Sequence, residues 1–143
     1  MNLTIKQQQR IEDLNLLPDP QERLSALVSA ANEFQLPHDQ RVDELIVKGC
    51  QSRVWLKGCL VEGRTAYSSA ADSPLVAGLV AELCRLYSGE DPAEVVAIEP
   101  VLWNKCGLEK LLSPTRLRGL EAVRQRIAQW AQQWTARGPQ DGV

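Results

Sequence analysis

Residues 53–69 read RVWLKGCLVEGRTAYSS, a pattern typical of a small sheet around which the rest of the chain must pack. Two β-type runs, residues 53–60 and 64–69, flank the turn residues Val61-Glu62-Gly63, which predicts an antiparallel hairpin. Leu45-Ile46-Val47 is a further short β-type run ahead of it. Elsewhere the apolar residues recur at helical spacing. The sequence therefore predicts an α+β fold, a small antiparallel sheet with helices packed against one face.

Signals for helix starts lie on both sides of the hairpin. Asp19 can cap a helix with Pro20 at its first position, and Glu22 completes a capping box. Ser73-Pro74 and Ser113-Pro114 are similar starts. The predicted helices are residues 4–14, 19–35, 73–89, a shorter one from Asp91, a piece over 103–112 interrupted at Gly107, and a last long one from Ser113 to Gly138.

Length and composition indicate one ordinary globular domain, residues 1–143, with a disordered tail at 137–143. The 16 basic and 18 acidic side chains give a net charge of −2, which argues against nucleic acid as the main partner. We find no basic stripe for an anionic membrane, no secretory signal, and no apolar run of the ~20 residues that span a bilayer. We therefore expect a soluble, cytoplasmic protein.

The chain has four cysteines without framework spacing, which is typical of a reducing compartment and predicts free thiols. Cys84 falls in the apolar stripe of a helix and is interpreted as core. The absence of a tight cysteine pair and the single histidine, His38, argue against a zinc site, and we expect no metal. A dithiol redox role would need a C-x-x-C motif, which the chain lacks.

Cys50 lies in Gly49-Cys50-Gln51-Ser52, interpreted as the tip of a loop that enters a strand. Glycine lets the backbone turn sharply, and loops on a rigid scaffold commonly carry function. One interpretation is a reactive thiol whose pKa Lys48 and Arg53 could lower. Another is a small residue that fills space. A nucleophilic pair with His38 is a third, although the local signatures of cysteine proteases are absent.

Other residues have simple structural interpretations. Asp72 is interpreted as a capping residue at the start of the helix that follows it. Arg116 opposes the dipole of the last helix, which indicates a partner elsewhere, either an internal carboxylate or another protein. We predict that Trp55 faces inward and that Trp130 and Trp134, four residues apart on one helix, pack against the core.

Several motifs together resemble one protein family. Residues 49–55, GCQSRVW, resemble the G-C-Q-S-x-V-W signature of SufE-type sulfur acceptor proteins. Residues 72–79 are similar to that family's D-x-x-[IL]-V-x-G-L helix start, and residues 113–120 to its [ST]-P-[ST]-R-x-x-G-L start of the final helix. Trp103 falls where the family has a tryptophan. Agreement of ordered motifs over about residues 16–130 is more specific than any one of them.

The resemblance implies a fold shared with iron–sulfur scaffold proteins and a role in sulfur transfer. Family members take persulfide sulfur from a cysteine desulfurase, stimulate that enzyme and pass sulfur towards iron–sulfur cluster assembly. Cys50 would be the acceptor, and the pyridoxal phosphate would belong to the desulfurase, with no cofactor here. Arg53 departs from an uncharged family position, and the remaining cysteines would be dispensable. The residues that would support the acceptor loop or contact the partner are Gly49, Gln51, Ser52, Asp72 and Arg116.

The chemistry of sulfur transfer agrees with one accessible thiol. A thiolate attacks the outer sulfur of a persulfide, without a metal, a histidine or a second cysteine. Because the product is reactive, we expect the loop to tuck it into an apolar pocket formed by Val54, Trp55 and a facing helix, and to evert on docking. The chain would then be an accessory carrier. The alternatives are a non-catalytic regulator with a structural Cys50, and an iron–sulfur or zinc scaffold.

Overall fold

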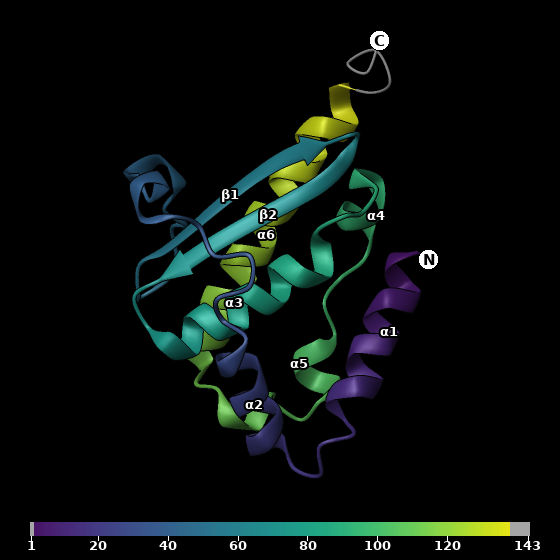
Figure 1. Cartoon of the computed structure of the whole chain (residues 1–143), viewed down its shortest axis with the longest axis vertical. Coiled ribbons are helices and arrows are strands. Elements are labelled where there is room, and N and C mark those ends of the chain that lie inside the picture. The colour runs from purple at the N-terminus through teal and green to yellow at the C-terminus, as the bar shows by residue number, and fades with distance from the viewer. Residues whose placement is uncertain (1, 138–143) are drawn as a thin grey trace.

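The computed structural model describes residues 2–137. Helices pack against one face of a long hairpin, and the last helix of the described residues runs along that hairpin (Figure 1). Three short 3-10 helices, η1 to η3, lie in the connections. The elements are α1 (Leu3–Leu14), α2 (Pro20–Ser29), η1 (His38–Gln40), η2 (Asp43–Leu45), β1 (Val54–Val61), β2 (Arg64–Ala71), α3 (Pro74–Tyr87), α4 (Pro92–Ala97), α5 (Leu102–Lys105), η3 (Glu109–Leu111) and α6 (Pro114–Arg137).

Strands β1 and β2 form the predicted antiparallel hairpin, which is confirmed. Their register runs from Val54 opposite Ala71 to Val61 opposite Arg64. Glu62 and Gly63 join the strands with φ of 53° and 78°. Two consecutive residues with positive φ match the twist of a hairpin, which explains the glycine at this turn.

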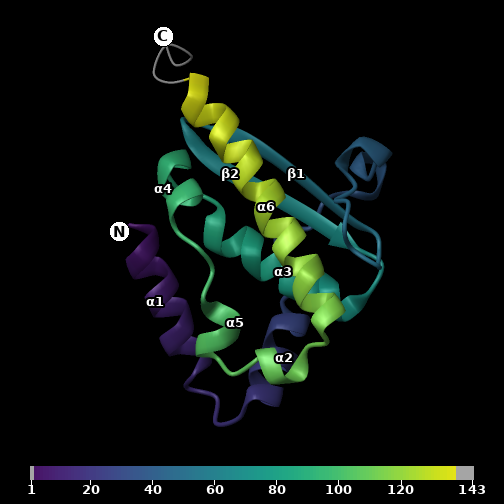
Figure 2. The same cartoon turned by 180° about the vertical axis from the view of Figure 1, so that it is seen from behind.

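Helices α3 and α6 cover one face of the sheet, as the views from the two sides show (Figures 1 and 2). Alternate residues of β1, Val54 and Leu56, are buried against these helices in the main core. Gly58 follows on the same face, where a Cβ would lie 3.0 Å from Cγ of Trp130. The glycine therefore lets the tryptophan of α6 pack directly on the strand. The α+β prediction is confirmed.

The opposite face of the sheet carries a second, smaller cluster. Trp55 is buried there with Leu36 and Ala70, and Leu45 and Ile46 pack against them. The prediction that Trp55 is buried is therefore confirmed, but its side chain lies on the face away from α3 and α6. The predicted packing of the tryptophans of α6 against the main core is also confirmed.

The helix caps predicted ahead of a proline are present, including the one at the start of α6, where Ser113 accepts a hydrogen bond from the backbone N–H of Arg116. Asp19 accepts a hydrogen bond from the backbone N–H of Glu22, and Ser73 accepts one from Val76. Asp91 accepts one from Ala93, at the start of α4. Asp72 does not cap α3, because Ser73 does so, and the capping interpretation of Asp72 is wrong.

Two predicted elements differ from the structure. Helix α2 ends at Ser29 instead of continuing to Gln35, since Phe34 adopts a φ of 62° and Gln35 bridges to Ser69 of β2. The β-type run at 45–47 is not a strand, because Ile46 alone forms a bridge, to Trp55. In both places, contacts with the hairpin override local propensity.

Polar contacts buried between the helices fix their arrangement. The Glu82 carboxylate of α3 is fully buried and accepts two hydrogen bonds from Arg10 of α1, at 2.9 and 2.7 Å. Arg85 also pairs with it. Gly78 lets α3 approach α2 closely, because a Cβ there would lie 2.6 Å from Cα of Val28.

Within residues 2–137, no helix has both the length and the apolar character needed to cross a bilayer. Helix α6 includes Arg137, the first residue of the expected tail. The rest of that expectation, residues 138–143, lies outside the described residues.

Candidate functional site: the Cys50 loop and its cavity

The segment Lys48–Arg53 is a short loop held at both ends. The backbone N–H of Val47 donates to the carbonyl of Val54 at 2.8 Å, which closes the base. The backbone N–H of Asp72 donates to the carbonyl of Arg53 at 3.1 Å, and the two side chains form an ion pair at 2.8 Å. Because the base of the loop is fixed to the sheet, the tip that carries Cys50 is held against α6.

The tip of the loop lies directly on α6. Cys50 Sγ lies 3.4 Å from the backbone carbonyl oxygen of Gly119, to which the thiol donates a weak hydrogen bond. A Cβ on Gly119 would lie 3.5 Å from that sulfur, and one on Gly49 would lie 3.2 Å from Cβ of Ala122. The second distance is tighter than an ordinary contact and the first is not, so Gly49 is the glycine that this close contact between loop and helix depends on.

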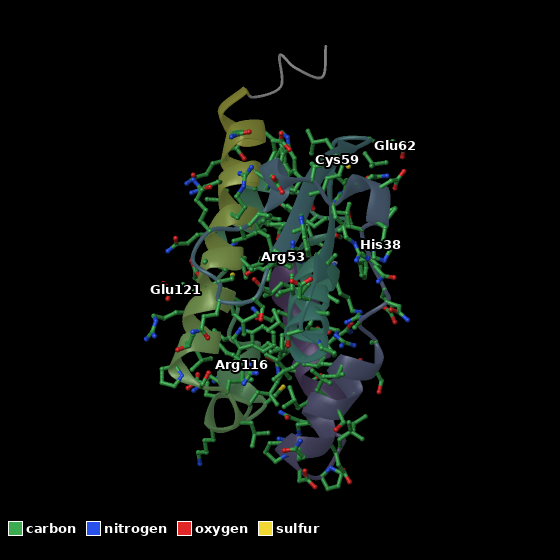
Figure 3. All side chains as sticks on the ribbon, turned by 90° about the vertical axis from the view of Figure 1, so that its left-hand side faces the viewer. His38, Arg53, Cys59, Glu62, Arg116 and Glu121 are labelled. Carbon is green, nitrogen blue, oxygen red and sulfur yellow. The ribbon has the colours of Figure 1, made fainter. Side chains whose placement is uncertain are left out.

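Cys50 forms part of the wall of a cavity of about 200 Å³ between the loop, α3 and α6. The wall from the two helices is largely apolar, whereas the loop and the first turn of α6 contribute polar groups. Arg116 is exposed and lines the same cavity; Figure 3 shows it near the start of α6. The lining residues are Cys50, Gln51, Ser52, Val76, Leu79, Val80, Ser113, Thr115, Arg116, Gly119, Leu120 and Val123.

Burial raises the pKa of the Cys50 thiol above its usual range. The interpretation in which Lys48 and Arg53 lower this pKa is not supported, because burial is the cause of the shift. Arg53 instead binds Asp72 and lies over the ring of Trp55, with Cζ 5.2 Å from the ring centroid. In this conformation Cys50 is held as the neutral thiol, which is a poor nucleophile.

The burial of the Cys50 thiol predicts how its alkylation rate depends on pH. We expect iodoacetamide to alkylate Cys50 slowly at neutral pH and faster as the pH rises, because burial delays formation of the thiolate. The measurement is the alkylation rate by intact mass from about pH 6 to about pH 10, with Cys59→Ser to remove the exposed thiol. The same protein in urea is the control, and an apparent pKa in the folded state at or below that control contradicts the expectation.

Gly49 offers a way to loosen the loop. Its φ of +99° is unfavourable for alanine by about 1–2 kcal/mol, and the added Cβ would also press on Ala122. We expect Gly49→Ala to destabilise the tucked conformer and to speed Cys50 alkylation by about 5–30-fold.

Gly63→Ala is the matched control for Gly49→Ala. Gly63 also has a positive φ, +78°, but no atom lies within 4 Å of its added Cβ, and it is in the hairpin turn away from Cys50. It should leave the alkylation rate of Cys50 unchanged. Equal rates for wild type and Gly49→Ala would show that the glycine does not hold the loop.

The other chemically reactive candidates lie elsewhere. Cys59 is exposed on β1, whereas Cys84 and Cys106 are fully buried, and burial raises the pKa of Cys84 to about 12. All four cysteines are free thiols, as predicted. His38 does not line the cavity, and Figure 3 shows it on the other side of the hairpin from α6. Over residues 2–137, no three His, Cys, Asp or Glu side chains gather in a group able to hold a metal ion.

The structure brings most of the sequence-predicted site residues together. Gln51, Ser52 and Arg116 line the cavity with Cys50, and Gly49 lies beside them. Asp72 does not line it and instead fixes the base of the loop through Arg53. Val54 and Trp55 do not line it either, so the expected cover from these two residues is wrong.

The sequence analysis did not predict Gly119 as a residue of the site. Its carbonyl accepts the hydrogen bond of the Cys50 thiol, and a Cβ at this position would lie in van der Waals contact with the sulfur. The available signal was an isolated glycine inside a strongly helical pattern, which often has a packing or functional reason.

Comparisons with known proteins agree with this geometry. A family model described as "SufE: Fe-S metabolism associated domain" matches residues 8–131. Uncharacterized SufE-like proteins from Synechocystis sp., Rhizobium meliloti and Rhizobium etli are 30%, 29% and 30% identical to this chain. The matches cover 71%, 83% and 86% of this chain and 64%, 89% and 87% of those relatives. The chain thus spans less than two thirds of the Synechocystis relative.

A solved structure has the same fold. The solution structure of a hypothetical protein from Thermus thermophilus superposes with a TM-score of 0.74 at 26% identity, over 92% of this chain and 96% of that one. The family match by itself includes the loop with Cys50, α3 and most of α6.

Proposed function

The chain belongs to the SufE family, and from this premise we propose that it takes persulfide sulfur from a cysteine desulfurase onto Cys50. In this proposal it stimulates the desulfurase and passes the sulfur towards iron–sulfur cluster assembly, in the cytoplasm. It acts as a carrier, with the pyridoxal phosphate on the desulfurase. The family description itself refers to Fe–S metabolism.

The observation that supports the proposal most is the position of Cys50 at a loop tip, on the wall of a partly apolar cavity. A sulfur carrier must receive sulfur from another protein and must protect it until it is passed on, and this position suits both functions. The tip can reach another protein, and the cavity can shield a reactive sulfur from bulk solvent and from oxidation.

The transfer is a thiol exchange. The Cys50 thiolate attacks the outer sulfur of the desulfurase persulfide, a new S–S bond forms on Cys50, and the desulfurase cysteine leaves as its thiolate. The raised pKa of the tucked thiol disfavours this attack in the free protein. Moving the loop tip into water removes the cost of burial, so docking that everts the loop also activates the nucleophile.

Desulfurase turnover tests the proposal. Candidate desulfurases, supplied with pyridoxal phosphate and cysteine, are assayed for alanine formation with increasing amounts of this protein. We expect one of them to show a saturable rise in rate, because the carrier removes sulfur that otherwise blocks the desulfurase cysteine. No rise with any candidate that binds the protein would contradict the proposal.

A further inference from the structure

The cavity beside Cys50 carries an unbalanced charge. Arg116 is the one residue among those lining it whose side chain is ionised at neutral pH. No carboxylate pairs with it in residues 2–137, where the ion pairs involve other residues. Its place in the first turn of α6 indicated either an internal carboxylate or another protein as its partner. Within residues 2–137, no such internal carboxylate is present. Asp72, the acidic residue at the base of the loop, is already bound to Arg53.

The cavity is also larger than a persulfide requires. A persulfide adds one sulfur atom to Cys50, whereas the cavity measures about 200 Å³. Pockets for drug-sized ligands measure about 300–1,000 Å³, so this one suits a smaller molecule. Its walls combine aliphatic side chains of α3 with hydroxyl groups of Ser52, Ser113 and Thr115.

We propose that this cavity binds a small thiol carrying a carboxylate, which takes the outer sulfur directly from the Cys50 persulfide. The inference rests on the proposed function, since it concerns the discharge of the same persulfide. Arg116 would bind the carboxylate through its planar guanidinium, and the apolar wall would contact the short carbon chain. The thiol end would then lie against Cys50, on the same cavity wall.

The reaction balances without an oxidant or reductant. The thiolate of the small molecule attacks the outer sulfur and forms a new S–S bond to it. The bond between that sulfur and Cys50 Sγ breaks, and Cys50 leaves as its thiolate and takes a proton from water. The proton on the outer sulfur stays with it. The products are a small-molecule persulfide and free Cys50.

The test loads Cys50 without any desulfurase. In Cys59→Ser protein, Cys50 is converted to a mixed disulfide with thionitrobenzoate, and hydrosulfide displaces that group to leave the persulfide. Loss of the outer sulfur from Cys50 is followed by intact mass under anaerobic conditions, with 3-mercaptopropionate or 2-mercaptoethanol as the thiol. The first reagent has a carboxylate where the second has a hydroxyl. Rates are divided by the thiolate concentration of each reagent. We expect the carboxylate thiol to react about tenfold faster.

Two variants identify the cation. Arg116→Gln should remove the preference for 3-mercaptopropionate, while Arg118→Gln, an exposed cation two residues on that does not line the cavity, should keep it. Equal rates for the two reagents in wild type, or an equal loss of preference in both variants, would overturn the proposal. Loading of Cys50 by a desulfurase is measured in a separate experiment. If the desulfurase does not load Cys50, the proposed function is refuted, but the preference for the carboxylate thiol can still be interpreted.

The size of the cavity should distinguish between two thiols that both carry a carboxylate, free cysteine and glutathione. Free cysteine is small enough for the space and should show the accelerated rate. Glutathione, a tripeptide, exceeds it and should react like 2-mercaptoethanol. An accelerated rate with glutathione that disappears in Arg116→Gln would mean attack from outside the cavity, and this too would overturn the proposal.

Discussion

Replacing Cys50 by serine is expected to reduce sulfur loading and desulfurase stimulation to the level measured without the protein. Serine preserves the approximate size of the side chain and a hydrogen-bond donor for the carbonyl of Gly119, but a hydroxyl does not exchange sulfur at neutral pH. The loop should keep its position on α6, since the serine hydroxyl can donate to the same carbonyl of Gly119 and Gly49 is unchanged. The measurements are alanine formation by the desulfurase and the intact mass of the carrier.

Cys59→Ser is the matched control for this substitution. Cys59 is more exposed than Cys50 and lies on β1, and it does not line the cavity beside Cys50. Its replacement should leave loading and stimulation unchanged. If Cys50→Ser still stimulates the desulfurase while Cys59→Ser does not, the acceptor has been misassigned. If Cys50→Ser stimulates without gaining sulfur, the protein is a regulator and not a carrier.

Removing the buried carboxylate of Glu82 is expected to have the largest effect on stability. Glu82 is fully buried, and Arg10 and Arg85 both bind it. Glu82→Ala would leave two guanidinium groups beside a void, at a cost of about 3 kcal/mol in the free energy of unfolding. The unfolding midpoint should fall by roughly 10 °C, which calorimetry would measure.

Two comparisons test the origin of that loss. Glu121→Ala removes an exposed carboxylate on α6 and should change stability by less than about 0.5 kcal/mol. Replacing Glu82 by leucine together with Arg10→Met and Arg85→Met should recover much of the loss, because apolar groups can replace a buried ion pair. An unfolding midpoint of Glu82→Ala equal to that of wild type would show that this cluster does not hold α1 on α3.

The sequence predicted those parts of the fold that depend on neighbouring residues. Asp19, Ser73 and Asp91 each precede a proline and cap a helix, and Glu62-Gly63 forms the hairpin turn. Both errors involved contacts distant in sequence. Helix α2 stops early because Gln35 joins β2, and the run at 45–47 stays irregular because Ile46 has a single bridge to the sheet. Local propensity does not contain such information.

The candidate site was predictable to a similar extent. A glycine before a cysteine at the entry to a strand indicated a loop tip, and the tip is where the structure has Cys50. The cavity was expected between Val54, Trp55 and a facing helix; helices α3 and α6 do form its wall, whereas the two strand residues do not. These helices meet the loop only after folding, so the sequence alone did not reveal the contact with Gly119 or the position of Arg116 in the cavity.

The most direct test of the account is the position of the transferred sulfur. Wild-type protein is incubated with desulfurase, pyridoxal phosphate and cysteine, the thiols are blocked, and the peptides are mapped by mass spectrometry. We expect one additional sulfur atom, on the peptide that contains Cys50. Sulfur found on Cys59, or no added sulfur while the desulfurase is stimulated, would contradict the role of Cys50 as the acceptor.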